Sequence, residues 1–275
     1  MIAHGKLKRC QAASKTEEAA FEMRYLEKSD LPQIMALQDV ILGRLSRKDL
    51  LEAFPRDFME SHIGSQGFII GIFVRKRLVA FRNVYFPDVN DREWNLGYDI
   101  GLETHEDLRR VANLQMLCVH PEFRGNSLGR RMNLHAIDAI RRERRFMHLC
   151  ATVSPYNYWN VSILLKCGFT IRTLKTKYNG KLRYVVHQNL DRPVRLPESS
   201  KRVSVRLTDL ERQKDLIGRG FIGVRIRAIE GFRPRRPTDY ANGFEVLFSK
   251  IPLPAECFCG RSTDISIGTF PVLDG

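Results

Sequence analysis

The stretch Leu117-Cys118-Val119-His120-Pro121-Glu122-Phe123-Arg124-Gly125-Asn126-Ser127-Leu128-Gly129-Arg130-Arg131-Met132 decides how this chain is interpreted. Its apolar start predicts a buried strand, which Pro121 ends. Small residues then predict a turn over residues 124–129, and apolar residues at helical spacing begin at Leu128. In such a strand–turn–helix, backbone N–H groups converge on a helix N-terminus that carries partial positive charge. The expected ligand of this turn is a pyrophosphate.

Two other phosphate-binding motifs do not fit this turn. A P-loop needs Lys followed by Ser or Thr after its last glycine, whereas Arg130 and Arg131 occupy those places. A dinucleotide fingerprint needs glycines at three set positions within a parallel unit. The segments before the turn, residues 67–74 and 78–86, instead predict a hairpin. A turn that serves only helix–strand packing remains the alternative.

Composition predicts a globular protein with a basic surface. The chain has 275 residues, 43% hydrophobic and 28% charged, which is enough for a sizeable core. No apolar run approaches the roughly 20 residues of a membrane span, and no apolar stretch follows the basic residues near the N-terminus. We therefore expect no membrane segment and no signal peptide. The six scattered cysteines favour free thiols, and hence a cytoplasmic protein, over a disulfide framework.

The order of predicted elements outlines the domains. We expect a flexible leader over residues 1–20, a main domain over 21–190, a linker over 191–200, an appended region over 201–251 and a flexible tail over 252–275. Within the main domain the patterns predict a strand, two helices (31–42 and 46–61), a hairpin, a strand, a helix, a strand, a helix and a last hairpin through Asn179-Gly180.

The appended region predicts strand, helix, strand, strand. Its segment Leu216-Ile217-Gly218-Arg219-Gly220-Phe221 is similar to Leu164-Leu165-Lys166-Cys167-Gly168-Phe169, since both end a helix at Gly-Phe and enter a strand. A degenerate second copy of the last part of the main domain is one interpretation. This βαββ region is also expected to pair with the edge of the last hairpin, to cover the acceptor side or to make a homodimer contact.

Two motifs in this order resemble those of the GNAT N-acetyltransferase superfamily. Val119-His120-Pro121 and Arg124-Gly125-Asn126-Ser127-Leu128-Gly129 match the acyl-CoA signature, with Ser127 in place of its usual first glycine. The second signature resembles Asn157-Tyr158-Trp159-Asn160-Val161-Ser162-Ile163-Leu164-Leu165-Lys166-Cys167-Gly168-Phe169. The resemblance covers residues 21–190 and implies an α/β (α+β) GNAT-like fold: a mixed, mostly antiparallel sheet flanked by helices, here with the appended βαββ extension.

The resemblance implies acyl transfer from acetyl-CoA, as acyl donor, to an amine. Leu117, Cys118 and Val119 would present backbone groups to the pantetheine and thioester. The amides of Arg124, Gly125, Asn126, Ser127, Leu128 and Gly129 would hold the pyrophosphate, assisted by Arg130 or Arg131. Asn157 and Asn160 would hydrogen-bond the pantetheine arm, although capping of the helix explains Asn157 equally well.

The chain departs from the family where many members place a catalytic tyrosine, because Leu164 stands there. Tyr156 or Tyr158 would then donate the proton from the preceding loop, or the thiolate of CoA would leave unaided. Glu103 is a candidate base, as are Asp99 and His120. Cys118 and Cys167 favour buried packing over nucleophilic roles, and neither the histidines nor Cys257-Phe258-Cys259 have the spacing of a metal site.

We therefore expect an N-acetyltransferase that acts on a primary amine of a small molecule. The alternatives are a non-catalytic acyl-CoA-binding regulatory module, an acetyltransferase of protein lysines or N-termini, and a nucleic-acid-binding protein. The net charge of +14 attracts polyanions in general. In the arginine cluster at 141, 142, 144 and 145, however, no aromatic residues interleave as a stacking surface would require, so nucleic acid is not the expected partner.

Overall fold

The computed structural model describes residues 1–10, 16–232 and 241–250, and their strands form one mixed sheet. The strand order is β1-β2-β3-β4-β5-β6-β8-β7-β10-β11-β9, and only the β5–β6 pair is parallel among the described residues. The strands are β1 (Ala3–Cys10), β2 (Thr16–Tyr25), β3 (Gly67–Val74), β4 (Arg77–Tyr85), β5 (Val111–Val119), β6 (His148–Val153), β7 (Thr170–Lys177), β8 (Lys181–Asn189), β9 (Arg202–Arg206), β10 (Phe221–Ala228) and β11 (Phe244–Lys250).

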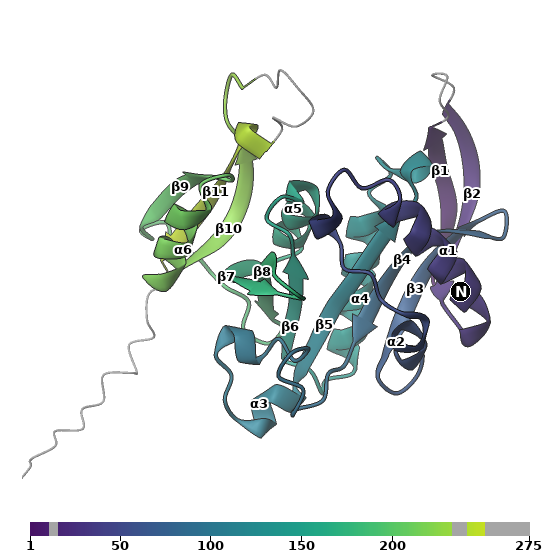
Figure 1. Ribbon diagram of the computed structural model, residues 1–275, viewed down its shortest axis with the longest axis horizontal. Helices are drawn as coiled ribbons and strands as arrows, with labels where there is room; N and C mark the ends of the chain where they lie inside the picture. The colour runs from purple at the N-terminus through teal and green to yellow at the C-terminus, as the bar shows by residue number, and fades with distance from the viewer. Residues whose placement is uncertain (11–15, 233–240, 251–275) are drawn as a thin grey trace, which may run out of the picture.

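Helices cover both faces of this sheet (Figure 1). They are α1 (Leu31–Leu42), α2 (Arg56–Ser61), α3 (His105–Arg109), α4 (Leu128–Arg142), α5 (Tyr158–Lys166) and α6 (Leu210–Gly218), with short 3-10 turns η1 (Lys28–Asp30), η2 (Lys48–Leu50), η3 (Tyr98–Ile100) and η4 (Pro121–Phe123). Apolar residues of α1 and α2 pack on one face, and those of α4 and α5 on the other. This confirms the predicted fold class, including the appended βαββ extension.

The N-terminal segment corrects one expectation. Where we expected a flexible leader over residues 1–20, β1 pairs along its length with β2 and adds a hairpin to the sheet. Leu7 and Ala19 are buried there, because alternate side chains of the hairpin join the core under α4. The many polar residues around these two positions make the alternation of a strand difficult to recognise in the sequence.

The expected helix over residues 46–61 is also wrong in its extent. The chain forms η2 and then α2, which begins only after Pro55. Pro55 cannot donate a helical N–H, and it disfavours helical geometry at the residue before it. A helix can therefore begin after Pro55 but does not continue through it. The expected helix over residues 31–42, in contrast, has the same bounds as α1.

The extension has the same connectivity as the segment that precedes it. In β6–α5–β7–β8 the first strand pairs with the third, and β9–α6–β10–β11 repeats this arrangement. Both helices end at a glycine with positive φ, Gly168 at 94° and Gly220 at 82°, where the left-handed conformation favours glycine. The two units meet where β7 pairs with β10, through Ile171 and Gly223.

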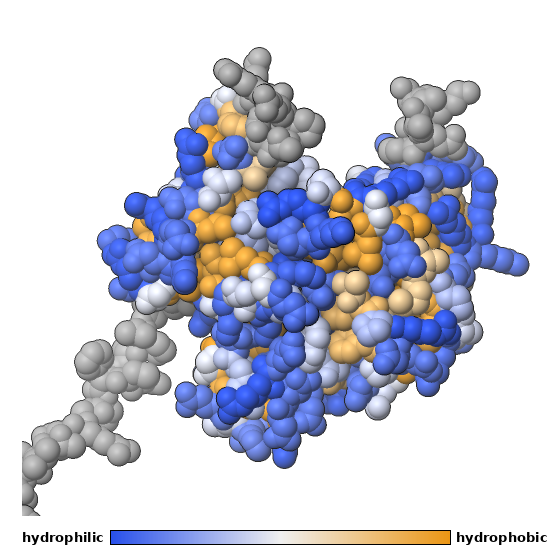
Figure 2. Space-filling view, in the orientation of Figure 1, coloured by the Kyte–Doolittle hydropathy of each residue, from blue (hydrophilic) through white to orange (hydrophobic). Residues whose placement is uncertain are grey.

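A buried polar contact fastens the extension to the main sheet. The Tyr184 hydroxyl of β8 donates to Oε1 of Gln213, which is fully buried on α6. The amide nitrogen of Gln213 in turn donates to the carbonyl oxygens of Arg206 and Leu207 at 2.9 and 3.0 Å. The extension also stacks Phe244 on Tyr158 of α5, with ring centroids 4.5 Å apart. In the space-filling view, hydrophobic residues gather where the extension meets the rest of the chain (Figure 2).

Replacing Gln213 by alanine is expected to destabilise the protein by about 3 kcal/mol, because the buried Tyr184 hydroxyl and the carbonyls of Arg206 and Leu207 lose their partner. The control Lys214→Ala changes an exposed neighbour on the same helix and should shift stability by less than about 0.5 kcal/mol. Urea unfolding midpoints of the two variants and the wild type measure the difference. Equal midpoints for the two variants would contradict the anchoring role of Gln213.

Within the described part of the chain, no helix combines the length and the apolar character needed to cross a membrane. The expected tail over residues 252–275, Cys257 and Cys259 lie outside the described residues. Residues 191–200, the expected linker, contain neither helix nor strand.

Candidate active site

The parallel pair of strands opens toward its C-terminal end. β5 and β6 pair only from Val111 with His148 to Leu114 with Ala151. Further along, β5 stays bonded to β4, up to Val119, and β6 stays bonded to β8, up to Val153. Two strands held by different outer neighbours leave free backbone groups between them, so a ligand can reach main-chain donors here.

A β-bulge lies at the start of this opening. Arg82 and Val84 of β4 pair with Leu117 and Leu114 of β5, so three steps along β5 oppose two along β4. Arg82, 1% exposed, donates through Nη1 to the Gln115 carbonyl at 3.1 Å and through Nε to Asn133 Oδ1 at 2.8 Å. Burial lowers the pKa of Arg82 to about 10, which still leaves it charged at neutral pH. A buried cation therefore holds the carbonyl side of the bulge.

The turn before α4 presents an uncapped helix N-terminus. Gly125 has a φ of 84° and Ser127 one of 57°, which turns the chain sharply into α4. Ser127 is the N-cap residue, but its side chain makes no capping hydrogen bond. The first-turn amides of α4 consequently lack helical acceptors, and their partial positive charge suits an anion. Arg124 and Arg130 are exposed beside this turn.

The N-terminal hairpin holds this turn in place. Asn126 accepts from the Lys8 N–H at 2.8 Å, and its amide nitrogen donates to the carbonyls of Lys8 and Phe123 at 2.7 and 3.0 Å. Arg9 forms an ion pair with Glu122 at 2.9 Å. The Asn126 side chain is thus engaged with β1, which leaves its backbone as the group available to a ligand.

Three elements meet at Gly129 in the first turn of α4. A Cβ at this position would lie 3.0 Å from Cδ2 of Leu117 in β5 and 3.5 Å from Cδ1 of Ile163 in α5. The structure therefore brings the sequence-predicted residues Leu117 and Gly129 together with α5. Cys118 points to the opposite face and is fully buried, and burial raises the pKa of its thiol to about 12. Only its backbone can serve a ligand.

The two asparagines of α5 have different surroundings. Asn157 is the N-cap, and its side chain accepts from the Asn160 N–H at 3.3 Å. This is the capping interpretation that the sequence left open for Asn157. The Oδ1 atom of Asn160 is buried and has no hydrogen-bond partner among the described residues. Buried polar atoms are rarely left unpaired, so Asn160 is the better candidate to meet a ligand.

The structure separates the three candidate catalytic residues. Tyr156 is half-buried just beyond the C-terminal end of β6, with the Arg47 guanidinium 3.7 Å from its ring centroid. Tyr158 is 7% exposed and its ring is stacked on Phe244. Glu103 is exposed just before α3, at the N-terminal end of β5 and far from the opening (Figure 1). Leu164 is buried in the core.

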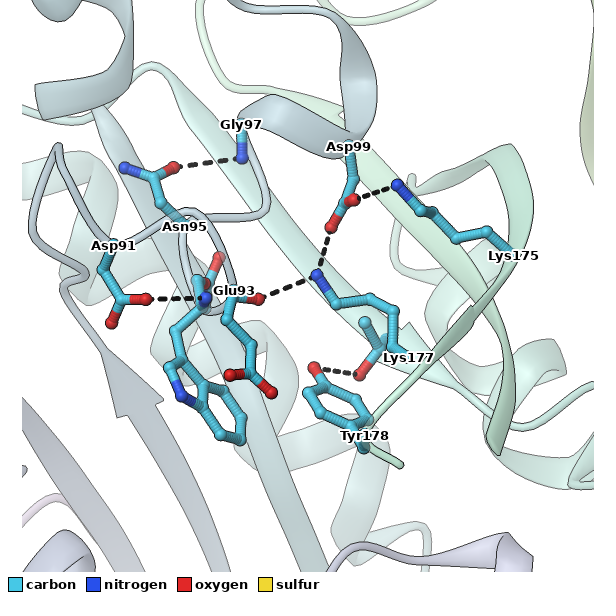
Figure 3. Close-up of polar contacts among 11 residues, drawn as sticks. Asp91, Glu93, Asn95, Gly97, Asp99, Lys175, Lys177 and Tyr178 are labelled. Atoms are coloured by element: carbon cyan, nitrogen blue, oxygen red, sulfur yellow. Dashed lines mark hydrogen bonds and ion pairs between the residues drawn. The ribbon is translucent and has the colours of Figure 1, made fainter. Parts of the chain in front are cut away.

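The segment before β5 is tied to β7 beside the opening (Figure 3). Asp99 accepts from Lys175 and Lys177 at 2.6 Å each, and Lys177 also donates to the Glu93 carbonyl at 2.8 Å. Asp99 is therefore paired with two lysines, and it is not a free base. His120 lies 2.9 Å from Arg77 through Nε2, and burial lowers its pKa.

An aromatic row that the sequence does not reveal borders the same region. Trp94 stacks on Tyr178 at 5.0 Å and contacts Phe58 at 5.1 Å, and Phe58 stacks on Phe54 at 4.8 Å. The Tyr178 hydroxyl lies 3.1 Å from the Thr152 hydroxyl on β6. These rings come from α2 and the residues before it, from the segment after β4 and from the β7–β8 turn, so only the fold assembles them. Among the described residues, no cluster of His, Cys, Asp or Glu could hold a metal ion.

His62 lies at the buried end of this aromatic row. Its burial leads us to expect that the stability of the fold depends on pH. It stacks on Tyr85 at 4.4 Å, and its Nδ1 lies 2.7 Å from Asn83 Nδ2. Burial lowers the pKa of His62 to about 4. Because the unfolded pKa is about 6.5, the unfolded state binds the proton first, and stability present above pH 6.5 is lost as pH falls toward 4. The loss from this group amounts to about 3 kcal/mol.

Urea midpoints measured from pH 7 to pH 4 test this expectation. Other groups contribute to the wild-type slope, since Asp30, Asp49 and Glu122 have lowered pKa values and lose stability in the same direction. The His62→Gln variant keeps an acceptor but does not titrate, so its stability should fall by about 3 kcal/mol less than that of the wild type. Identical slopes would show that His62 is not a buried neutral histidine.

Comparison with known proteins agrees with this geometry. Residues 41–169 match the model of the acetyltransferase (GNAT) family. This range runs from the end of α1 through the opening and the turn at residues 124–129 to the end of α5. No curated protein matches the chain.

Three solved structures are among those similar to it. An acetyltransferase of the GNAT family from Streptococcus pneumoniae has 15% identity and a TM-score of 0.47, covering 62% of this chain and 98% of its own. The ribosomal-protein-S18-alanine N-acetyltransferase from Escherichia coli has 17% identity and a TM-score of 0.45, covering 65% and 97%. The aminoglycoside acetyltransferase AAC(6')-Ib in complex with coenzyme A and kanamycin has 14% identity and a TM-score of 0.46, covering 62% and 94%. The chain is thus similar to the acetyltransferase (GNAT) family over residues 41–169, slightly under half of its length.

Proposed function

We propose that this protein transfers an acetyl group from acetyl-CoA to a primary amine of a small molecule, by direct attack in a ternary complex. One observation carries the proposal: the uncapped N-terminus of α4 and the opening between β5 and β6 lie at the same end of the sheet, within the matched range. An anion site next to free main-chain groups suits a long substrate that has a pyrophosphate at one end and a thioester at the other.

The residues of the site fit this substrate. The amides of residues 124–129, with Arg130, would hold the pyrophosphate. At Gly129 the absence of a side chain lets α4 approach Leu117 closely. The unpaired Oδ1 of Asn160 would accept a hydrogen bond from an amide of the pantetheine arm. Main-chain groups of Leu117, Cys118 and Val119 would contact the arm and the thioester.

Acetyl-CoA would supply an acetyl group already activated as a thioester. The protein then has to orient the amine and stabilise negative charge on the thioester oxygen with backbone N–H donors. Arg82 would keep the donors of the bulge in position through its bond to Gln115. The hydroxyl of Tyr156 would give a proton to the departing sulfur, in the role that Leu164 cannot fill. Tyr156 is preferred over Tyr158, whose ring packs in the core, and over Glu103, which lies at the other end of β5.

The acceptor is proposed to be small because two loops are tied over the acceptor side. Lys177 and Asp99 hold the segment after β4, and Lys181 of β8 pairs with Glu52 before α2 at 2.6 Å. These bonds bring both loops against β7 and β8 and limit the space for an extended peptide. Residues 201–250 would complete the sheet beside this region and stiffen it through Gln213 and Tyr184.

The cysteines support a reducing location, and we propose the cytoplasm. Cys118, Cys150 and Cys167 are buried free thiols. Burial raises the pKa of each of these thiols, which suits packing and not redox chemistry.

The test is a screen for release of the CoA thiol from acetyl-CoA, with panels of amino sugars, polyamines, amino acids and lysine peptides. We expect release with at least one small amine, at a kcat/KM above that of every peptide. Release of the CoA thiol with peptides alone would show that the acceptor is a protein and not a small molecule. Tight binding of acetyl-CoA without release of the CoA thiol for any amine would show that the protein is a non-catalytic acyl-CoA binder.

A further inference from the structure

An open cavity lies away from the proposed acyl-transfer site. It measures about 640 Å³ and is bordered by β2, β3, the segment after β4 and the C-terminal end of α4; the residues that matter are Tyr25, Phe68, Phe86, Arg142, Glu143 and Arg145. The 15 residues of α4 span roughly 20 Å. This cavity is therefore at the opposite end of α4 from the turn at residues 124–129, and the acyl-transfer proposal does not use it. Its volume is in the range of small-molecule sites.

Aromatic rings from distant parts of the sequence line one side of it. Tyr25 meets Phe68 edge-on at 5.5 Å, Phe68 meets Phe86 at 6.0 Å, and Phe86 stacks on Phe146 at 4.4 Å. Tyr25 is 44% exposed. The Arg145 guanidinium lies 4.6 Å from the Phe86 ring centroid and 4.4 Å from that of Phe146. The fold thus supplies the aromatic partners that the arginine cluster lacks in the sequence.

The charges on the rim favour an anion at one position. Arg145 pairs with Glu143 at 2.8 Å, and Arg141 pairs with Asp138 at 3.3 Å. Arg142 forms no ion pair with any described residue. The C-terminal end of a helix carries partial negative charge and repels anions, so an anion can be held here only by a guanidinium that is not already neutralised. Arg142 is that group.

We propose that this cavity binds a nucleoside phosphate. The base would stack on the exposed ring of Tyr25, beside the half-buried rings of Phe68 and Phe86, since every base offers a π face to an aromatic side chain. The phosphate would accept charge-assisted hydrogen bonds from Arg142. The same chemistry is offered by a free mononucleotide and by one nucleotide of a single-stranded RNA.

Isothermal titration with AMP, GMP, UMP and CMP tests the proposal, in the absence of CoA, because CoA itself carries a nucleoside phosphate that would compete for this cavity. We expect one-to-one binding of at least one nucleotide and much weaker binding of the corresponding nucleoside. Arg142→Ala should weaken binding about tenfold. The matched control Arg141→Ala removes the same charge one residue away, outside the cavity, and should change the affinity less than about twofold.

Two further experiments test the contribution of the aromatic rings to binding and the source of the nucleotide. Phe86→Leu should weaken nucleotide binding about tenfold, with the thermal midpoint measured to show that the variant folds. Anisotropy of fluorescein-labelled hexauridylate distinguishes the sources: affinity well above that of UMP, falling steeply with salt, supports RNA, and affinity equal to that of UMP supports a free nucleotide.

Two results would overturn the proposal: no nucleotide binding at millimolar concentration, or equal losses in Arg141→Ala and Arg142→Ala, which would indicate only a diffuse positive surface. Acetyl-CoA affinity should be unchanged in Arg142→Ala, so this proposal and the acyl-transfer function can fail independently.

Discussion

Replacing Gly129 by glutamate is expected to weaken acetyl-CoA binding more than 100-fold, because a carboxylate would face the pyrophosphate at the N-terminus of α4. The new side chain would also enter the contact with Leu117, where a Cβ already lies 3.0 Å from Cδ2. Isothermal titration with acetyl-CoA measures the change. The matched control is Gly218→Glu, which adds the same charge on α6 where no atom lies within 4 Å of the new Cβ, and it should bind like the wild type.

A second variant distinguishes a loss of binding from a loss of folding. Ser127 is exposed and makes no capping bond, so Ser127→Glu adds a carboxylate at the same helix end without entering the core. It should weaken acetyl-CoA binding at least about tenfold. If both Gly129→Glu and Ser127→Glu bound acetyl-CoA with wild-type affinity, the turn would not be part of the acetyl-CoA site.

Changing Tyr156 to phenylalanine is expected to lower kcat about 100-fold while the KM for acetyl-CoA stays within about twofold, because the ring is retained and only the proton donor is lost. Arg47 still has an aromatic ring to pack on, so the loop geometry is preserved. Steady-state rates of CoA release, with the best amine from the screen, measure both constants.

The adjacent variant Tyr158→Phe is the control for the second prediction. Its ring packs on Phe244, and phenylalanine keeps this contact. We expect a kcat within about threefold of the wild type, as for a residue outside the reaction. The reverse pattern would assign the proton to Tyr158, and two active variants would mean that the thiolate leaves unaided.

Local patterns predicted the elements that carry their own signals. The residue range of α1 follows from apolar spacing, and the β3–β4 and β7–β8 hairpins follow from apolar strands around short turns, the second at Asn179-Gly180. The turn at residues 124–129 was predicted from its small residues, and in the structure Gly125 and Ser127 adopt the left-handed conformation there. What a few consecutive residues determine can be predicted from one sequence.

Features that depend on distant residues could not be predicted in this way. Asn126 bonds Lys8 across 118 positions, so its role in holding the turn is visible only once β1 joins the sheet. Trp94 and Tyr178, like Tyr25 and Phe86, come together through the sheet and not through sequence spacing. The extension does pair with the edge of the last hairpin as expected, through β10 and β7, but the register that sets Gly223 opposite Ile171 is not encoded in any periodicity.

The most direct test of the central claim is the thermal midpoint of the wild-type protein with acetyl-CoA, CoA, ATP or NAD at 100 times the dissociation constant measured for acetyl-CoA. Binding to the folded state alone adds about 2.7 kcal/mol at that concentration, which predicts a rise of roughly 5 °C with acetyl-CoA. CoA should give a similar rise, and ATP and NAD at the same concentration should give a clearly smaller one, because they lack the pantetheine arm and bind only at the cavity beside Arg142. No rise with acetyl-CoA, or an equal rise with all four compounds, would contradict a dedicated acyl-CoA site at the opening between β5 and β6.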